Sequence, residues 1–142
     1  MIEIRRARDA AEVEAALELR SRVFVDEQGV TPAADQDGRD GDALHVLAFD
    51  DSRLVGTCRL VFDGQLARLG RMAVERELRG YGIGAAILAA AECEARMAGA
   101  RRVRLHAQTA AQSLYERAGY VAAGDEFIEE GIPHVTMEKT FA

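Results

Sequence analysis

Hydrophobic and polar positions alternate in short stretches of the chain. Between these stretches lie segments whose apolar residues have helical spacing, or turns marked by glycine and aspartate. Residues 2–5 read Ile-Glu-Ile-Arg, an alternation typical of a strand with one buried face. Similar alternation, or a short apolar run bounded by turn residues, predicts further strands at residues 43–49, 53–62, 66–74, 101–107, 120–123 and 134–140.

Three segments have helical character. Asp9 is a predicted N-cap with Glu12 as its capping-box partner, and the helix after it carries an approximate apolar face. That face comprises Val13, Leu17, Val23 and Phe24. Residues 79–98 are rich in alanine and are followed by Gly99, which fits a C-terminal cap. Residues 109–118 form a shorter helix closed by Gly119.

Residues 26–42 contain acids, glycines and one proline, and they predict a loop or lid between the first helix and the second strand. The resulting order is β-α-β-β-β-α-β-α-β-β. A meander of three strands followed by a crossover predicts an α+β protein, with helices on the faces of a mixed sheet.

Composition narrows the classes of protein. The chain has 142 residues, the length of a single domain, with 18 basic and 24 acidic residues and a net charge of −6. That charge argues against nucleic acid as the main partner. No stretch reaches the length of a membrane span or looks like a signal peptide. Two cysteines without a CxxC pattern or zinc spacing predict a reduced cytoplasmic chain without a metal site.

Glycines cluster between a predicted strand and a predicted helix, at Gly80, Gly82 and Gly84. A helix start presents unpaired N–H groups, and glycines let a phosphate approach them closely, so the segment suggests a phosphate cradle. An ordinary glycine-rich turn is the alternative. The dinucleotide pattern fits Gly80, Gly82 and Ala85, but no acid follows at the end of the next strand, and a Walker A sequence is absent.

With its flanks, this turn resembles the GNAT acetyltransferase superfamily. The hallmark Q/R-x-x-G-x-G/A is present as Arg79, Gly82 and Gly84, after the strand segment 69–74. The similarity extends to an ElaA-like subgroup through segments that span nearly the whole chain. They are residues 22–30, 35–42 with His45 beyond them, 56–60, 107–108, 115–120 and 131–137.

The resemblance implies a GNAT-like fold, with a central mixed, mostly antiparallel sheet of six to seven strands flanked by helices. It implies acetyl-CoA as the donor, with its pyrophosphate on the backbone amides of residues 80–85. Backbone groups near Met72, Ala73 and Val74 would pair with the pantetheine arm beside a bulge, as an open strand edge can. The implied cofactor-binding residues are Met72, Ala73, Val74, Arg79, Gly80, Tyr81, Gly82, Ile83, Gly84 and Ala85.

Catalytic roles follow from the same resemblance. Tyr115 matches the family's position for the acid that protonates the departing thiolate. The base stays open among Glu27, Glu126, His106, His134 and a water chain. The expected acceptor pocket comprises Phe24, Glu27, Gln28 and His134. The acidic segment 26–42 is a candidate attractor for a cationic acceptor.

The expected function is N-acetyl transfer from acetyl-CoA to a primary amine by direct attack in a ternary complex. The acceptor would be a small-molecule or peptide amine, with no nucleic acid or membrane partner, and a homodimer is left open. A non-catalytic acyl-CoA-binding module on the same fold is the alternative. A small nicotinamide-binding protein is a weaker one, because the ribose-binding acid is missing.

Overall fold

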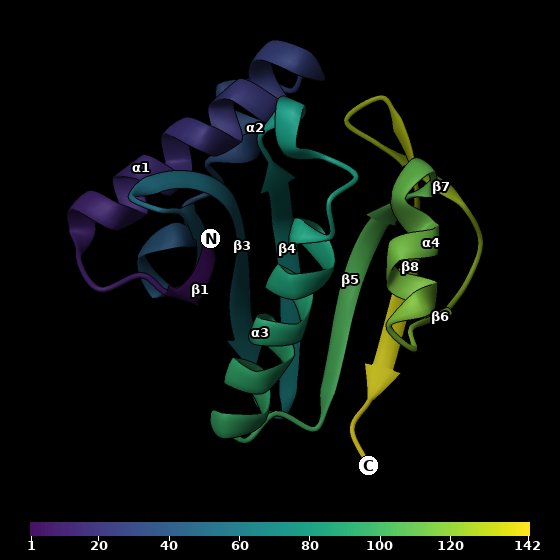
Figure 1. Ribbon diagram of the computed structural model, residues 1–142. Coiled ribbons are helices and arrows are strands. Elements are labelled where there is room, and N and C mark those ends of the chain that lie inside the picture. Colours follow the sequence, from purple (N-terminus) through teal and green to yellow (C-terminus); the bar gives the residue numbers. More distant parts are fainter.

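The computed structural model describes residues 1–142 and is built around one twisted sheet (Figure 1). The strands are β1 (Ile2–Arg6), β2 (Leu44–Asp50), β3 (Arg53–Asp63), β4 (Leu66–Val74), β5 (Arg102–Gln108), β6 (Val121–Ala122), β7 (Phe127–Glu129) and β8 (Ile132–Thr140). The helices are α1 (Ala10–Arg20), α2 (Pro32–Asp35), α3 (Ile83–Met97) and α4 (Gln112–Arg117). A π-helical segment, Ser21–Glu27, continues α1.

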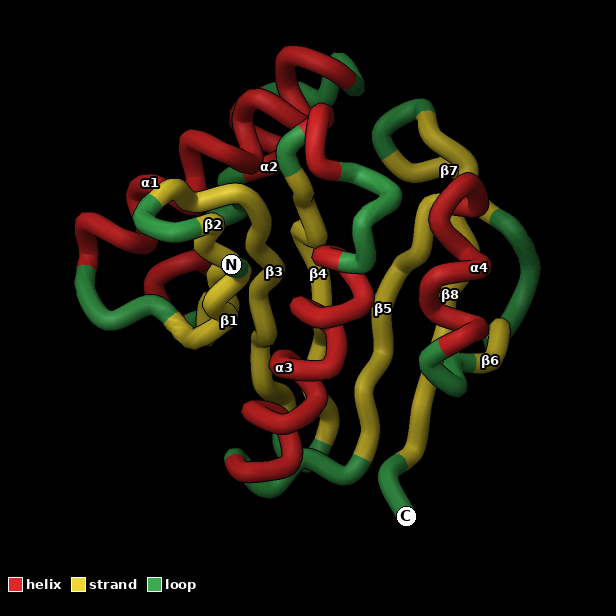
Figure 2. The backbone as a smooth tube through the Cα atoms, in the orientation of Figure 1, coloured by secondary structure: helices red, strands yellow, loops and turns green.

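The sheet has eight strands in the order β1-β2-β3-β4-β5-β8-β6, and β7 pairs with β8 as well. Every pairing is antiparallel except β4 with β5, so the expected mixed, mostly antiparallel GNAT-like sheet is confirmed. Figure 2 shows the strands as one continuous layer with helices beside it. Strand β7 was not predicted from the sequence; it is three residues long and pairs only with β8.

Several predicted boundaries shift. The helix predicted from residue 79 begins at Ile83, because Gly80 and Gly82 have φ angles of 85° and 84° that no right-handed helix contains. Asp9 caps α1 as expected, accepting from the Glu12 amide at 2.9 Å. The Glu12 carboxylate instead accepts from the Arg8 amide, so the capping box is displaced by one residue.

Helices pack on both faces of the sheet. On one face, α3 packs over β2, β3 and β4, and its Ile87 and Leu88 lie in the main core. A Cβ atom added at Gly56 would come within 2.6 Å of the Ile87 side chain, so glycine lets α3 approach β3 closely. On the other face, Leu19 and Val23 form a smaller cluster against β4. None of the helices combines the length and the apolar character that a membrane span requires.

Strands β4 and β5 separate along their length. Their parallel pairing runs only from Leu66–Arg102 to Leu69–Leu105, and Figure 1 shows them diverging beyond it. A bulge accompanies the divergence, because the register between β3 and β4 slips by one residue near Arg71. Arg71 has a φ of 56°, in the left-handed region, which is typical of a bulge position. The implied bulge is therefore confirmed, and the sheet splays open beside it.

Candidate functional site

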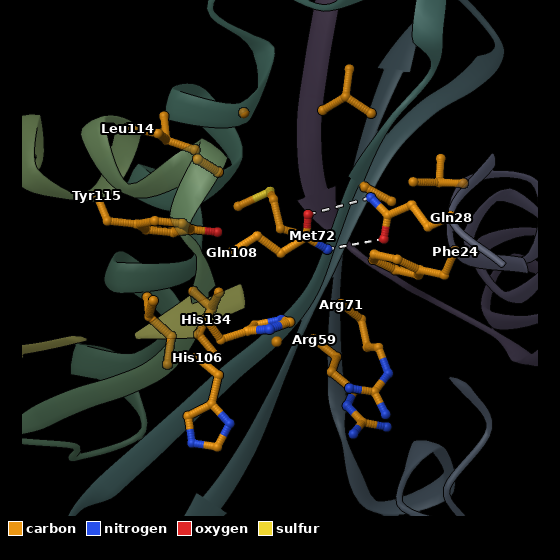
Figure 3. A pocket seen from close by; sticks show the side chains of 18 of the residues that line it. Phe24, Gln28, Arg59, Arg71, Met72, His106, Gln108, Leu114, Tyr115 and His134 are labelled. Carbon is orange, nitrogen blue, oxygen red and sulfur yellow. Dashed lines mark hydrogen bonds between the residues drawn. The ribbon is translucent and has the colours of Figure 1, made fainter. Parts of the chain in front are cut away.

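A cavity of about 990 Å³ opens where β4 and β5 part (Figure 3). Its lining comes from the π-helical segment, β4, the glycine turn, β5, α4 and β8. The cavity brings together most of the residues proposed from the sequence. They are Phe24, Gln28, Met72, Ala73, Val74, Arg79, Gly80, Gly82, Ile83, Gly84, Ala85, Tyr115 and His134.

Of four other proposed residues, three do not line the cavity and one lies half exposed at its wall. Glu27 and Glu126 do not line the cavity, so neither is placed to act as a base there. Tyr81 also stays outside it, and its side chain is 77% exposed, so only its backbone could take part. His106 lines the cavity wall but is half exposed.

The glycine turn leads into the start of α3 with open space before it. Gly82 is the N-cap of α3 and supplies no side chain to satisfy the first amides of the helix. A Cβ atom at Gly80 or Gly82 would meet no atom within 4 Å, so a ligand can approach the backbone there. The helix dipole and unpaired N–H groups at this position favour an anion.

Arg79, beside this turn, is already engaged. Its Nε donates to the Val74 carbonyl at 3.0 Å, and its two terminal nitrogens each donate to the Glu27 carboxylate at 2.9 Å. This pair ties the end of the π-helical segment to the glycine turn. Glu27 therefore meets Arg79 rather than an acceptor.

The cleft side of β4 is an open strand edge. Residues 70–74 lie beyond the last β4–β5 pair and have no strand partner on that side. Across the cleft, Gln108 Nε2 donates to Gln28 Oε1 at 2.9 Å, and the reverse bond measures 3.4 Å. Figure 3 shows this amide pair next to Met72. From the sequence, Gln108 was identified only as part of a segment that resembles the family, and no local pattern indicated its partner.

Tyr115 on α4 projects its hydroxyl into the cavity (Figure 3). The residue is 6% exposed, its ring packs edge-on against Tyr120 at 6.0 Å, and its hydroxyl makes no hydrogen bond within the chain. Burial, with a smaller contribution from Cys58, raises the Tyr115 pKa above its ordinary value. The phenol therefore keeps its proton at neutral pH and is able to donate it.

His134 on β8 faces the same cavity and is 7% exposed. Its Nδ1 lies 2.7 Å from the Ile132 carbonyl oxygen, and its Nε2 lies 3.7 Å from Glu129 Oε2. His106 Nδ1 lies 3.1 Å from the other oxygen of Glu129. Glu129 was not singled out from the sequence, because it belongs to the missed strand β7.

Asp35, Asp37 and Asp40 of the acidic segment are paired within the chain, so these three carboxylates do not offer the free charge expected to attract a cation. Three arginines on α1, β3 and β4 neutralise them, and the pairs are Arg20 with Asp35 and Asp40, Arg59 with Asp37 and Asp40, and Arg71 with Asp35 and Asp37. Arg20 and Asp35 are almost fully buried. The hydrogen bond from Arg59 holds the Asp37 pKa well below its usual range.

Arg71 anchors this network to the bulge. Its Nε donates to the Asp35 carbonyl and its Nη2 to the Ala34 carbonyl, both at 3.1 Å. The charged pairs thus fasten the segment after α1 to β4, and this fixes one wall of the cavity. Buried charges are tolerated here because each has an opposite partner and hydrogen bonds.

Comparison with known proteins decides the family. Residues 7–141 match the family model described as Acetyltransferase (GNAT) domain. The chain belongs to the GNAT acetyltransferase family. An uncharacterised Bacillus subtilis protein, YyaT, is 35% identical over 139 residues, which cover 96% of this chain and 94% of YyaT.

Solved GNAT structures share the whole fold. Escherichia coli ElaA superposes with a TM-score of 0.87 at 29% identity, covering 98% of this chain and 99% of ElaA. An acyl-CoA N-acyltransferase from Pseudomonas aeruginosa gives a TM-score of 0.84 at 30% identity, covering 99% of both chains. The resemblance inferred from the glycine turn and its flanks is confirmed, and membership supports acyl-CoA-dependent N-acyl transfer.

The cavity of this GNAT chain fits an acyl-CoA. A pyrophosphate needs an anion-binding turn, and a pantetheine arm carries amides that need partners. The glycine turn leaves its backbone open, and residues 70–74 of β4 form an edge without a strand partner. Both features line one cavity, so this chain's residues suit the donor that the family uses.

Proposed function

We propose that this GNAT chain transfers an acetyl group from acetyl-CoA to a primary amine, by direct attack of the amine while both substrates are bound. One observation carries the proposal. An anion-binding turn, an open strand edge and a phenol without a partner line a single cavity. Each serves a different part of the reaction.

The backbone holds and polarises the donor. The amides of residues 80–85 bind the pyrophosphate, and the edge formed by Met72, Ala73 and Val74 pairs with the pantetheine arm. Bound acetyl-CoA supplies a thioester whose carbonyl carbon is the electrophile. A backbone N–H at Met72 or Ala73 polarises the carbonyl and stabilises the negative charge that develops on its oxygen.

Tyr115 is the general acid. Its raised pKa keeps the phenol protonated, and its hydroxyl is free to donate to the departing thiolate. Proton donation of this kind typically contributes about 10²–10⁴-fold to the rate.

The acceptor lies on the side of the cavity formed by Phe24, Gln28 and His134. We infer a small-molecule or peptide amine. The network of aspartates and arginines next to it is internally neutralised, so it selects no cation by net charge.

The test is release of thiol from acetyl-CoA in the presence of primary amines, with Tyr115→Phe and Tyr120→Phe compared. Tyr120 is a matched control, because it is buried against Tyr115 but does not line the cavity. Tyr115→Phe should lower kcat about 10²-fold or more while the Kd for acetyl-CoA stays unchanged. Unchanged kcat would remove Tyr115 as the acid. Binding of acetyl-CoA without transfer to any amine would make the chain an acyl-CoA-binding module.

A further inference from the structure

The hairpin of β7 and β8 holds His134 rigidly at the cavity wall. Phe127 is its register partner on β7, and the two rings stack 5.9 Å apart with an interplanar angle of 22°. Gln108 on β5 is its register partner on the other side. Figure 3 shows the imidazole of His134 projecting toward the part of the cavity that contains Met72 and Arg71.

One hydrogen bond sets the tautomer of this ring. The Ile132 carbonyl oxygen lies 2.7 Å from His134 Nδ1 and can only accept, so Nδ1 carries the proton. In the neutral ring, the lone pair is then on Nε2. A proton acceptor with a fixed orientation is what a general base requires.

A carboxylate lies near this ring. Glu129 Oε2 lies 3.7 Å from His134 Nε2, while Glu129 Oε1 is held by His106 at 3.1 Å.

Besides the two histidines and Glu129, the charged side chains that line the cavity are Asp35, Asp37, Arg39, Arg59, Arg68, Arg71, Arg79, Arg104, Arg117 and Glu130. Arg59 is bonded to Asp37 and Asp40, and Arg71 is bonded to backbone carbonyls of the acidic segment. Both arginines are thus directed to other partners, and Glu129 is the charged group paired with the ring.

We propose that His134 Nε2 is the general base that removes a proton from the acceptor ammonium. This assignment rests on the proposed N-acetyl transfer. An alkylammonium has a reference pKa near 10.4, so only about one molecule in 10³–10⁴ is uncharged at neutral pH. A base beside the nucleophile removes that limitation.

The proton balance is complete. The amine nitrogen forms a bond to the thioester carbon, and the carbon–sulfur bond breaks with its electron pair on sulfur. The ammonium gives up two protons in becoming an amide. One leaves through His134 to water, and the thiolate takes one proton from Tyr115, which recovers it from the second amine proton through solvent.

The experiment compares two amine probes that differ in basicity. n-Propylamine is almost fully protonated at neutral pH, whereas methoxyamine is largely uncharged and needs no base before attack. His134→Gln should lower kcat/KM for n-propylamine about 10²-fold or more and change the rate with methoxyamine only a few-fold. The methoxyamine rate also reports that the variant is folded and binds acetyl-CoA. Equal losses with both amines would overturn the base assignment.

One further variant is the matched control. His45→Gln also removes a buried imidazole that contacts a backbone carbonyl, but His45 does not line the cavity, so the variant should keep the wild-type dependence on amine basicity. If the wild-type chain transfers acetyl to neither amine, the proposed function itself fails, which is a different outcome from equal losses in the variant.

Discussion

Arg79 and Glu27 form a two-point ion pair with both hydrogen bonds at 2.9 Å, next to the glycine turn. The pair occupies both terminal nitrogens of the arginine that the family pattern assigns to the cofactor. An arriving phosphate therefore competes with the Glu27 carboxylate for the same donors.

Removing that competitor should strengthen binding of acetyl-CoA. We expect Glu27→Gln to lower the Kd a few-fold, and Arg79→Ala to raise it about 10-fold, since a hydrogen bond to a charged group contributes about 1.5–3 kcal/mol. Isothermal titration with acetyl-CoA measures both. Asp26→Asn removes the same charge from the neighbouring exposed residue, which has no side-chain partner, and should leave the Kd unchanged. Weaker binding by Glu27→Gln would show that the pair supports the site rather than competing for it.

The bond between Arg59 and Asp37 should make stability depend on acid pH. The pKa of Asp37 is lowered in the folded protein, so its contribution is present above the unfolded value near 3.9 and is lost as pH falls below it. Asp37→Asn should therefore cost about 1–3 kcal/mol at neutral pH, and the difference from wild type should shrink below about pH 4. Urea unfolding at neutral pH and below about pH 4 measures this difference in the free energy of unfolding. Asp42→Asn, exposed in the same segment, is the control and should show no such difference. A cost that persists in acid would mean that packing, not charge, holds the segment.

Cys58 should make the fold sensitive to alkali. Burial raises the pKa of its thiol to about 12, against about 9 for an ordinary cysteine. Between these values the unfolded chain loses a proton that the folded chain keeps, so the free energy of unfolding falls as pH rises above about 9. Cys58→Ala should lower the free energy of unfolding at every pH. The decline of that free energy between about pH 9 and 10 should be less steep than in the wild type, and urea unfolding midpoints measure both effects.

The same burial predicts thiol reactivity. Cys93 is exposed and Cys58 is buried, so a thiol-specific reagent should modify Cys93 in the native protein and both residues after unfolding. Rapid modification of native Cys58 would contradict its inert environment.

Local patterns predicted most of the framework. The apolar run that follows the Asp63-Gly64 turn signal predicted β4 with the bounds observed, Leu66–Val74. Long-range relationships were not predictable in this way. Gln28 and Gln108 are 80 residues apart, and only the fold places them together. The ion pairs between the acidic segment and the arginines of α1, β3 and β4 were not predictable either. Local composition alone suggested that the carboxylates of this segment were unpaired.

The candidate site was predictable for a different reason. The glycine turn, the β4 edge and Tyr115 belong to segments that resemble a known family, so the family supplied roles that spacing alone left open. His134 and Glu129 show the limit of that approach, since their relationship depends on a three-residue strand with a weak pattern of its own. Edge strands this short gain most of their stability from the partner strand, which sequence reading does not reveal.

The central claim is that the cavity between β4 and β5 binds acetyl-CoA, and a thermal-shift titration tests it most directly. Wild-type chain is heated with increasing acetyl-CoA, with NADH in a parallel series. Ligand at about 100 times its Kd stabilises a folded protein by about 2.7 kcal/mol, which is a readily measured shift. We predict a saturating rise in Tm with acetyl-CoA and none with NADH. No rise with acetyl-CoA, or an equal rise with NADH, would contradict the assignment of this cavity.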